Sequence, residues 1–244
     1  MNMSESSSKR KFRKQEKIMT KKDFDEIFTK LLELFPNPDT ELNFETPFQL
    51  LIAVMLSAQT TDKQVNVVTD KLFLKIKNPN DVLNMTEEKL AKQVSSVNYY
   101  KTKTKHIRES AQRLVDLFKD KKTRFTKNEK ECLNKYGYYL PENIELLTRL
   151  PWVGEKTAKV ILYVRYKHNL IAVDTHVHRV ANRLWIVKTN EPLETSKKIE
   201  KAIPKKWKRI AHHSLILFWR YYCTAKKPKC ENCVLKKWCK NPEL

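Results

Sequence analysis

Apolar residues along this chain recur at helical spacing, and alternation of the kind found in strands is nearly absent. Residues 24–35 carry a stripe at i, i+3 and i+4, and Thr20 with Asp23 forms a capping box in front of it. Residues 47–57 are almost all apolar and begin at Pro47, which suits the first turn of a helix. Comparable patterns predict further helices near 61–76 (after a second capping box), 80–85, 87–94, 103–119, 142–149, 155–167, 175–184, 199–203 and 207–222. There is no internal repeat, and the predicted fold class is all-α with short connections.

Two segments depart from this pattern. Residues 1–19 are basic and lack an apolar core, so we interpret them as a disordered tail and not as a secretory signal. Residues 119–139 are charged and weakly periodic, which predicts a partly helical excursion at the surface. No apolar run approaches the length that spans a bilayer.

The charge of the chain changes the functional picture. Its 244 residues carry 49 Lys and Arg against 28 Asp and Glu, a formal net charge of +21. Such an excess suits a polyanionic partner, and nucleic acid is the leading candidate. An anionic membrane surface and a merely solvated, lysine-rich surface are the alternatives.

The stretch LPWVGEKTAKV, residues 150–160, holds one of only two glycines in the chain. Pro151 suits the second position of a turn, and Gly154 is expected to free the backbone where a helix begins. The N–H groups at such a helix start can bind a phosphate, although an ordinary helix connection would look similar. Lys156 follows in the first helical turn, where the macrodipole disfavours a protonated amine. A neutral lysine amine can form a Schiff base; the alternative is one more surface lysine.

Asp174 stands directly before a predicted helix. On its own it is best interpreted as an N-cap that bonds the backbone of residue 176 or 177, with assistance to a nearby amine as the alternative. His176 and His178 point to different faces of that helix, which argues against a metal site formed by this pair.

Four cysteines are the most specific feature. Cys223, Cys230, Cys233 and Cys239 have the spacing C-x6-C-x2-C-x5-C, and lysines are interleaved with them. Without a secretion signal, a metal site is favoured over disulfides, and four clustered thiolates suit a zinc ion or an iron–sulfur cluster. Four unrelated buried cysteines would be improbable at this spacing. Cys132 stands alone.

Five motifs in the same order resemble the endonuclease III family of DNA glycosylases, in the helix–hairpin–helix superfamily. They are ELNFETPFQLLIAVMLSAQTTDKQVN, LPWVGEKTAKV, IAVDTHVHRV, HHSLILFWRYYC and the cysteine run, and the likeness covers about residues 20–240. The resemblance implies two helical domains with DNA in the cleft between them. One is a six-helix barrel at 40–168 that includes the hairpin 150–155. The other holds a [4Fe–4S] cluster and is built from 20–39 plus 169–244.

The resemblance also assigns roles to single residues. Lys156 would attack the sugar C1′ of a flipped nucleotide, and Asp174 would stabilise the cationic sugar and help to activate the amine. The hairpin 150–155 would hold a phosphate through backbone amides, with Pro151, Val153 and Gly154 as its DNA-binding residues. Gln59 would fill the gap left by the flipped nucleotide, and Tyr99 would wedge the opposite strand. The four clustered cysteines would ligate the cluster.

Two tryptophans depart from the family pattern. Trp152 and Trp219 each stand where the family usually has glycine, and the stretch around 118–133 resembles an insertion. A type II turn needs a positive φ at position 152, so either the turn is type I or packing holds Trp152 in strain.

The predicted function is a bifunctional DNA glycosylase and apurinic/apyrimidinic lyase that removes oxidised pyrimidines in base excision repair. The alternatives are a monofunctional mismatch glycosylase and a non-catalytic, metal-stabilised DNA-binding module. The expected partner is double-stranded DNA with damaged bases or abasic sites, with no membrane and a monomeric enzyme. It would act in the cytoplasm, at the nucleoid, in a bacterium or archaeon, and in the nucleus or mitochondrion of a eukaryote.

Overall fold

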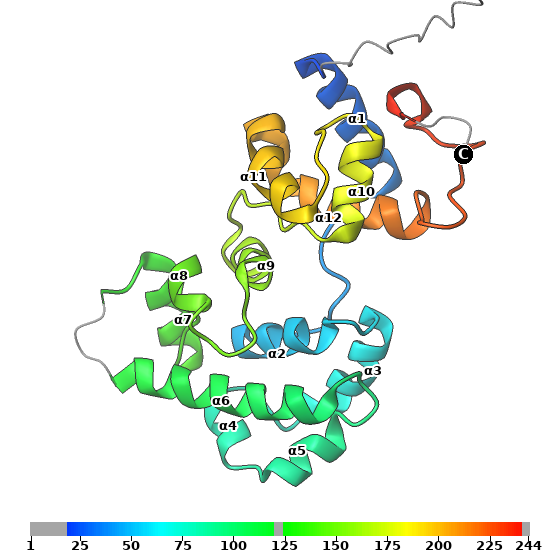
Figure 1. Cartoon of the computed structure of the whole chain (residues 1–244). Helices are drawn as coiled ribbons and strands as arrows, with labels where there is room; N and C mark the ends of the chain where they lie inside the picture. Colours follow the sequence, from blue (N-terminus) through cyan, green and yellow to red (C-terminus); the bar gives the residue numbers. More distant parts are fainter. Residues whose placement is uncertain (1–18, 120–123, 241–244) are drawn as a thin grey trace, which may run out of the picture.

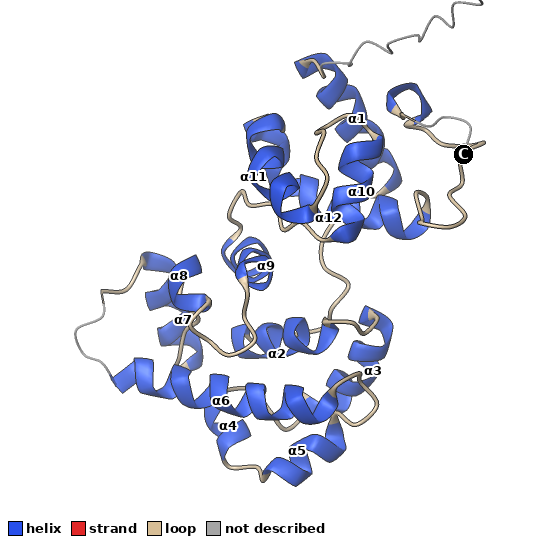
Figure 2. Ribbon diagram, in the orientation of Figure 1, coloured by secondary structure: helices blue, strands red, loops and turns tan. Residues whose placement is uncertain are grey.

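The computed structural model describes residues 19–119 and 124–240, and this part of the chain is helical with no strand (Figure 1, Figure 2). The all-α prediction is confirmed. The twelve α-helices of these ranges are α1 Lys21–Leu34, α2 Pro47–Ser57, α3 Asp62–Leu72, α4 Pro79–Leu83, α5 Glu87–Gln93, α6 Tyr100–Lys119, α7 Lys127–Tyr136, α8 Ile144–Leu147, α9 Glu155–Tyr166, α10 Thr175–Arg183, α11 Pro192–Ala202 and α12 Lys205–Tyr221. A short 3-10 helix, η1, follows at Lys236–Trp238. None of the described helices is long and apolar enough to cross a membrane.

Local side-chain chemistry sets where the helices begin. Thr20 and Asp23 form the predicted capping box of α1, and Pro47 opens α2 as expected. The second predicted box is only half formed. Thr61 accepts the Gln64 backbone N–H, but the Gln64 side chain donates to Ser96 Oγ at 2.9 Å instead of returning to its own helix start.

The buried apolar side chains gather in two separate cores. The first core lies between residues 42 and 166 and is built on α2, whose residues 47–56 are all buried. The second core joins α1 to α10, α11, α12 and the residues around η1. Aromatic packing supports the second core, where the Phe28 ring on α1 stacks on Trp207 of α12 at 5.5 Å between centroids.

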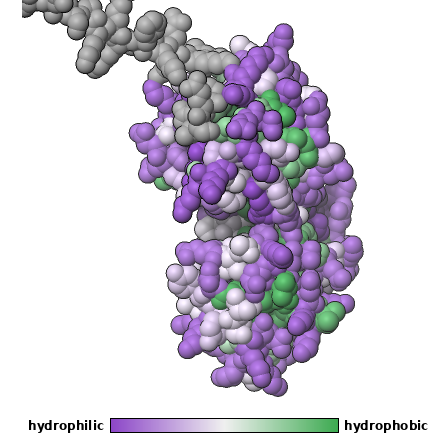
Figure 3. Space-filling view, turned by 90° about the vertical axis from the view of Figure 1, so that its right-hand side faces the viewer, coloured by the Kyte–Doolittle hydropathy of each residue, from purple (hydrophilic) through white to green (hydrophobic). Residues whose placement is uncertain are grey.

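The chain passes between the two cores in two places, between α1 and α2 and between α9 and α10 (Figure 1). The space-filling view shows two lobes that meet at a waist (Figure 3). We propose that the domain boundaries expected from the sequence, 40–168 against 20–39 plus 169–244, correspond to these lobes. The partition of the buried residues supports that proposal.

The charged stretch 119–139 is partly helical, as predicted, because it contains α7. Glu129 caps α7 and also accepts the Glu142 N–H at 2.7 Å, while Cys132 is fully buried. The described part of this stretch, 124–139, is therefore packed against the rest of the protein at Glu129 and Cys132. The predicted basic tail, except for residue 19, lies outside the described residues.

Candidate active site and nucleic-acid interface

Lys156 and Asp174 meet where two helices begin. Lys156 is the second residue of α9, and Asp174 is the N-cap of α10. Lys156 Nζ lies 3.2 Å from Asp174 Oδ2, although the residues are 18 apart in sequence. The lysine side chain is 52% exposed and the aspartate 19%, so the amine faces solvent while the carboxylate is sheltered behind it. The predicted N-cap is confirmed.

The two oxygens of Asp174 have different partners. Oδ1 accepts the N–H groups of His176 at 2.9 Å and Val177 at 2.8 Å, whereas Oδ2 faces Lys156. Burial disfavours the charged carboxylate, but the Lys156 charge and the Val177 N–H outweigh it and hold the pKa of Asp174 below its ordinary value. Asp174 is therefore an anion at neutral pH, fixed to α10 by one oxygen with the other turned to the amine.

The turn before α9 is type II. The Val153 N–H donates to Leu150 O at 3.1 Å, Pro151 occupies the second position, and Trp152 occupies the third with φ of 64°. Packing against α6 supports this strained conformation. The Trp152 ring lies over His106, 4.8 Å between centroids and tilted by 31°, and Ser110 Oγ donates to Pro151 O at 3.3 Å. Of the two alternatives open from the sequence, strain held by packing is the observed one.

Gly154 does not need the conformational freedom expected of it. Its φ of −79° and ψ of 175° are extended backbone that any residue adopts, and an added Cβ would meet nothing within 4 Å. The N–H groups in the first turn of a helix have no intrahelical partner, and in α9 no capping side chain accepts from them. The exposed Gly154 leaves these groups open to solvent, while the Val153 side chain is buried in the first core.

Gln59 and Tyr99 lie on neighbouring loops. Both have φ of 57°, in the left-handed region that residues with a Cβ adopt uncommonly. The Asn98 side chain donates to Gln59 O, and the Asn98 N–H donates to Thr60 Oγ1 at 3.3 Å. Tyr99 is 62% exposed and Gln59 is exposed. Through Asn98, the structure thus brings the loops of these two predicted site residues together.

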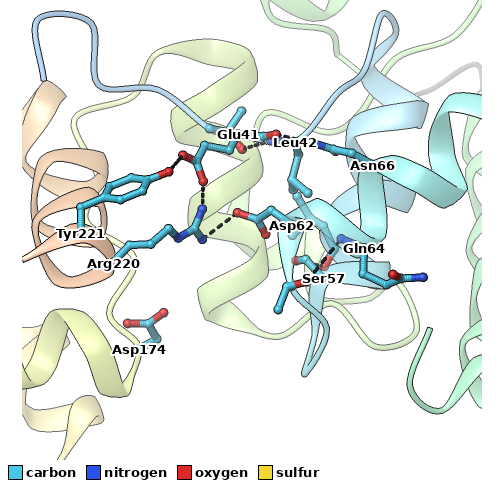
Figure 4. Close-up of polar contacts among 12 residues, drawn as sticks. Glu41, Leu42, Ser57, Asp62, Gln64, Asn66, Asp174, Arg220 and Tyr221 are labelled. Carbon is cyan, nitrogen blue, oxygen red and sulfur yellow. Dashed lines mark hydrogen bonds and ion pairs between the residues drawn. The ribbon is translucent and has the colours of Figure 1, made fainter. Parts of the chain in front are cut away.

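An ion network beside this site was not anticipated from the sequence. Arg220 of α12 pairs with Glu41 and, at 2.8 Å, with Asp62 Oδ2, while Tyr221 Oη donates to Glu41 Oε1 at 2.6 Å (Figure 4). Burial raises the pKa of Asp62, and the nearby Lys156 charge opposes that rise. Nothing in the sequence distinguishes this arginine from the other 48 basic residues.

Cys223, Cys230, Cys233 and Cys239 line one pocket beside the end of α12. Arg183 of α10 reaches into this loop, where its Nη1 lies 3.3 Å from Cys223 Sγ and 3.1 Å from Thr224 O. Four thiols with a guanidinium beside them provide the donor set and the positive surroundings that an anionic iron–sulfur cluster requires. The histidines of α10 lie elsewhere, since His176 stacks on Trp219 and His178 bonds Thr195 Oγ1.

Known proteins match most of this chain. Residues 52–209 match the HhH-GPD superfamily base excision DNA repair protein, and residues 223–239 match the iron–sulfur binding domain of endonuclease III. Endonuclease III of Haemophilus influenzae is 38% identical over 218 residues, which cover 89% of this chain and 95% of that protein. Endonuclease III of Escherichia coli K12 is 36% identical over 218 residues, covering 89% of this chain and 95% of its own length.

Solved structures match over the whole described fold. A trapped endonuclease III–DNA covalent intermediate, in an estranged-adenine complex, superimposes with a TM-score of 0.78 at 36% identity, covering 92% of this chain and 97% of that chain. A thermostable thymine-DNA glycosylase superimposes with a TM-score of 0.72 at 22% identity, covering 91% of this chain and 97% of that one, and shows a shared fold.

Proposed function

Because the chain belongs to the endonuclease III family of helix–hairpin–helix base excision repair proteins, we propose that Lys156 is the nucleophile and Asp174 its partner in a bifunctional reaction on DNA. The enzyme is a DNA glycosylase and apurinic/apyrimidinic lyase that binds DNA and carries a [4Fe–4S] cluster. The observation that carries the assignment of residues is the 3.2 Å contact between Lys156 Nζ and Asp174 Oδ2 at two helix starts.

The contact suits each step of amine catalysis. Asp174 Oδ2 is placed to accept a proton from the Lys156 ammonium and so to free the lone pair. The amine then bonds to C1′ of the everted nucleotide as the C1′–N glycosidic bond breaks, and the base leaves with the bonding electrons. The proton then passes from Asp174 to the departing base, so the carboxylate is ionised again, the form that the site favours, and faces the positive charge on the sugar.

The lyase step needs an imine, which forms when the nitrogen loses a second proton and its lone pair expels O4′ from C1′, and the released ring oxygen is protonated. Protonated imine nitrogen makes the C2′ proton acidic, a base removes it, and the electrons expel the 3′ phosphate oxygen in a β-elimination. Water then releases Lys156 by hydrolysis of the imine. Oδ1 of Asp174 stays bound to the start of α10 throughout, so the catalytic carboxylate keeps its position during turnover.

The remaining site residues have matching roles. We assign the first turn of α9 to a DNA phosphate, because open helix N–H groups favour an anion. The hairpin residues Pro151, Val153 and Gly154 lead into that turn and are assigned to the same phosphate. Gln59 and Tyr99 are assigned to the space left by the everted nucleotide and to the opposite strand, supported by their exposure on adjacent loops. The four cysteines Cys223, Cys230, Cys233 and Cys239 would ligate the cluster, which fastens the basic C-terminal loop when bound.

The proposed substrates are oxidised pyrimidines and abasic sites in double-stranded DNA, with the enzyme acting as a monomer. It would work where the genome lies, at a prokaryotic nucleoid or in a eukaryotic nucleus or mitochondrion. A mismatch glycosylase without lyase activity needs no lysine beside Asp174, and a binding module needs neither residue, so the Lys156–Asp174 contact favours the bifunctional reaction over both.

Three duplexes that differ at one base test the substrate assignment. They carry thymine glycol opposite adenine, unmodified thymine opposite adenine, and thymine opposite guanine. We expect base release and a nick 3′ to the site with thymine glycol only. Release from the mismatch duplex without a nick would contradict the assignment and support the monofunctional alternative.

A further inference from the structure

Lys103 is a buried lysine without a carboxylate partner among the described ion pairs. Its side chain is 1% exposed, near the start of α6. The amine donates to Leu56 O at 2.7 Å, Ala58 O at 2.7 Å and Thr60 Oγ1 at 3.3 Å. Burial lowers the pKa of Lys103, yet three acceptors match the three donors of its protonated form.

These acceptors lie where α2 ends. The last carbonyl groups of a helix have no intrahelical partner and carry the negative end of the macrodipole. A lysine ammonium there donates hydrogen bonds to these carbonyl groups and its charge interacts favourably with the dipole. Lys103 therefore holds the segment 56–60 in place, and Gln59 lies within this segment at a strained φ of 57°. An apolar residue of the same length would leave the carbonyl groups buried without donors.

The loop that holds Tyr99 leads directly into the start of α6. Tyr99 O accepts the Lys103 N–H at 3.0 Å, so the first turn of α6 begins at Tyr99. Asn98 donates two hydrogen bonds to the loop that holds Gln59. Its side chain donates to Gln59 O, and its backbone N–H donates to Thr60 Oγ1. Thr60 Oγ1 thus accepts from both Lys103 and Asn98. The loops that hold Gln59 and Tyr99 are joined through one small polar network.

We propose that Lys103 is a positioning residue that makes the Gln59 loop and the Tyr99 loop one rigid unit, which holds DNA open after a nucleotide has been everted. This inference rests on the proposed function, because an enzyme that everts a nucleotide must fill the space it leaves. Lys103 does not touch the reacting atoms, and its effect is largest where a paired base must leave the helix, because an abasic site has no base pair to break.

Lys103→Met tests this assignment by comparing two reactions of one enzyme. Excision of thymine glycol opposite adenine requires eversion of a paired base, whereas β-elimination at a preformed abasic site requires no base to leave. In single-turnover assays we expect excision to slow by about tenfold or more and abasic-site cleavage to change by less than about threefold. The excision defect shrinks when the lesion is placed in an unpaired bubble, a result that general loosening of the fold would not produce.

Two further variants keep the test decisive. Asn98→Ala removes the side-chain hydrogen bond to Gln59 O at an exposed position. It should show the same selective defect in excision, and it tests the inference even if Lys103→Met fails to fold. Lys89→Met, at an exposed position on α5, is the matched control with both rates unchanged. Equal loss of both reactions, or loss of neither, in folded Lys103→Met and Asn98→Ala overturns the inference. Inactivity of the unsubstituted enzyme on both duplexes would instead overturn the proposed function.

Discussion

Asp174 shows how one carboxylate can serve structure and chemistry together. Its Oδ1 caps α10 and its Oδ2 faces Lys156, so the two roles can be separated by substitution. Asn keeps a side-chain oxygen that caps well, whereas Ala removes cap and charge.

We expect Asp174→Asn to slow single-turnover excision by about 100-fold or more, because the carboxylate that assists the amine is lost. Its free energy of unfolding should change little, while Asp174→Ala should lose about 1 kcal/mol through the missing cap. Urea unfolding and excision rates on the same samples measure both effects. Full activity in Asp174→Asn would show that the carboxylate acts only as a cap.

Trp152 stores strain that a glycine would release. A φ of 64° costs a bulky residue about 1–3 kcal/mol, which its ring contact with His106 offsets in part. We expect Trp152→Gly to retain excision activity and affinity for a duplex with an abasic-site analogue, since the hairpin amides keep their places. His106→Ala is the control that removes the ring contact and keeps the strain. A large loss of affinity in Trp152→Gly alone would show that the indole itself contacts DNA.

At the scale of elements, periodicity and capping chemistry predicted most of the helices. The start of α3 after Thr61 agrees with the prediction, but its end at Leu72 falls short of the predicted 76. A tertiary bond replaced a local one at Gln64, whose side chain bonds Ser96 and leaves the capping box half formed. Lys156 and Asp174 lie in contact, as the family resemblance implied, although only Asp174 could be recognised from its helix cap. Lys103 and Arg220 were missed because long-range contacts define their roles. A signal for Lys103 did exist, since it occupies the apolar stripe of α6 four residues before the buried Ile107.

The contact between α12 and α9 predicts an acid-sensitive fold. His212 and His213 of α12 pack on Tyr163 of α9. Burial lowers the pKa of His212 to about 3, with the neighbouring His213 adding to the effect. Burial lowers the pKa of His213 to about 4, although Asp39 opposes that shift. In the unfolded chain both histidines have a pKa near 6.5 and bind protons below that pH. In the folded protein they stay neutral over the same pH range.

Stability should therefore be full above about pH 6.5 and should decrease as the pH falls toward 4. We expect the free energy of unfolding in urea to be about 4 kcal/mol lower at about pH 5 than at about pH 7.5, about 2 kcal/mol from each histidine. His213→Asn should show a shallower dependence, and cluster absorbance followed in parallel separates this effect from cluster loss. Equal stability at the two pH values would mean that the histidines are not buried as neutral groups.

At the scale of the whole molecule, Arg220 makes one of several polar contacts between the two lobes. It links α12 of the second core to Asp62 at the start of α3 and to Glu41 in the connection between α1 and α2. The guanidinium offsets two carboxylates, so removing it leaves both uncompensated beside the waist.

Arg220→Gln should lower the free energy of unfolding by about 1–3 kcal/mol. Glu41→Gln should lower it by less, because Arg220 keeps its ion pair with Asp62. Thermal and urea unfolding of both variants measure the difference. Equal effects of the two substitutions would show that the Asp62 pair contributes nothing.

The most direct test of the whole account is borohydride trapping on an abasic-site duplex. The unsubstituted enzyme should form a covalent adduct, and peptide mapping should place the sugar on Lys156. Lys156→Ala should form no adduct and make no nick while still binding the duplex, and Lys197→Ala, on the exposed face of α11, should behave as the unsubstituted enzyme. A trapped adduct or retained strand scission in Lys156→Ala would contradict the assignment of Lys156 as the nucleophile.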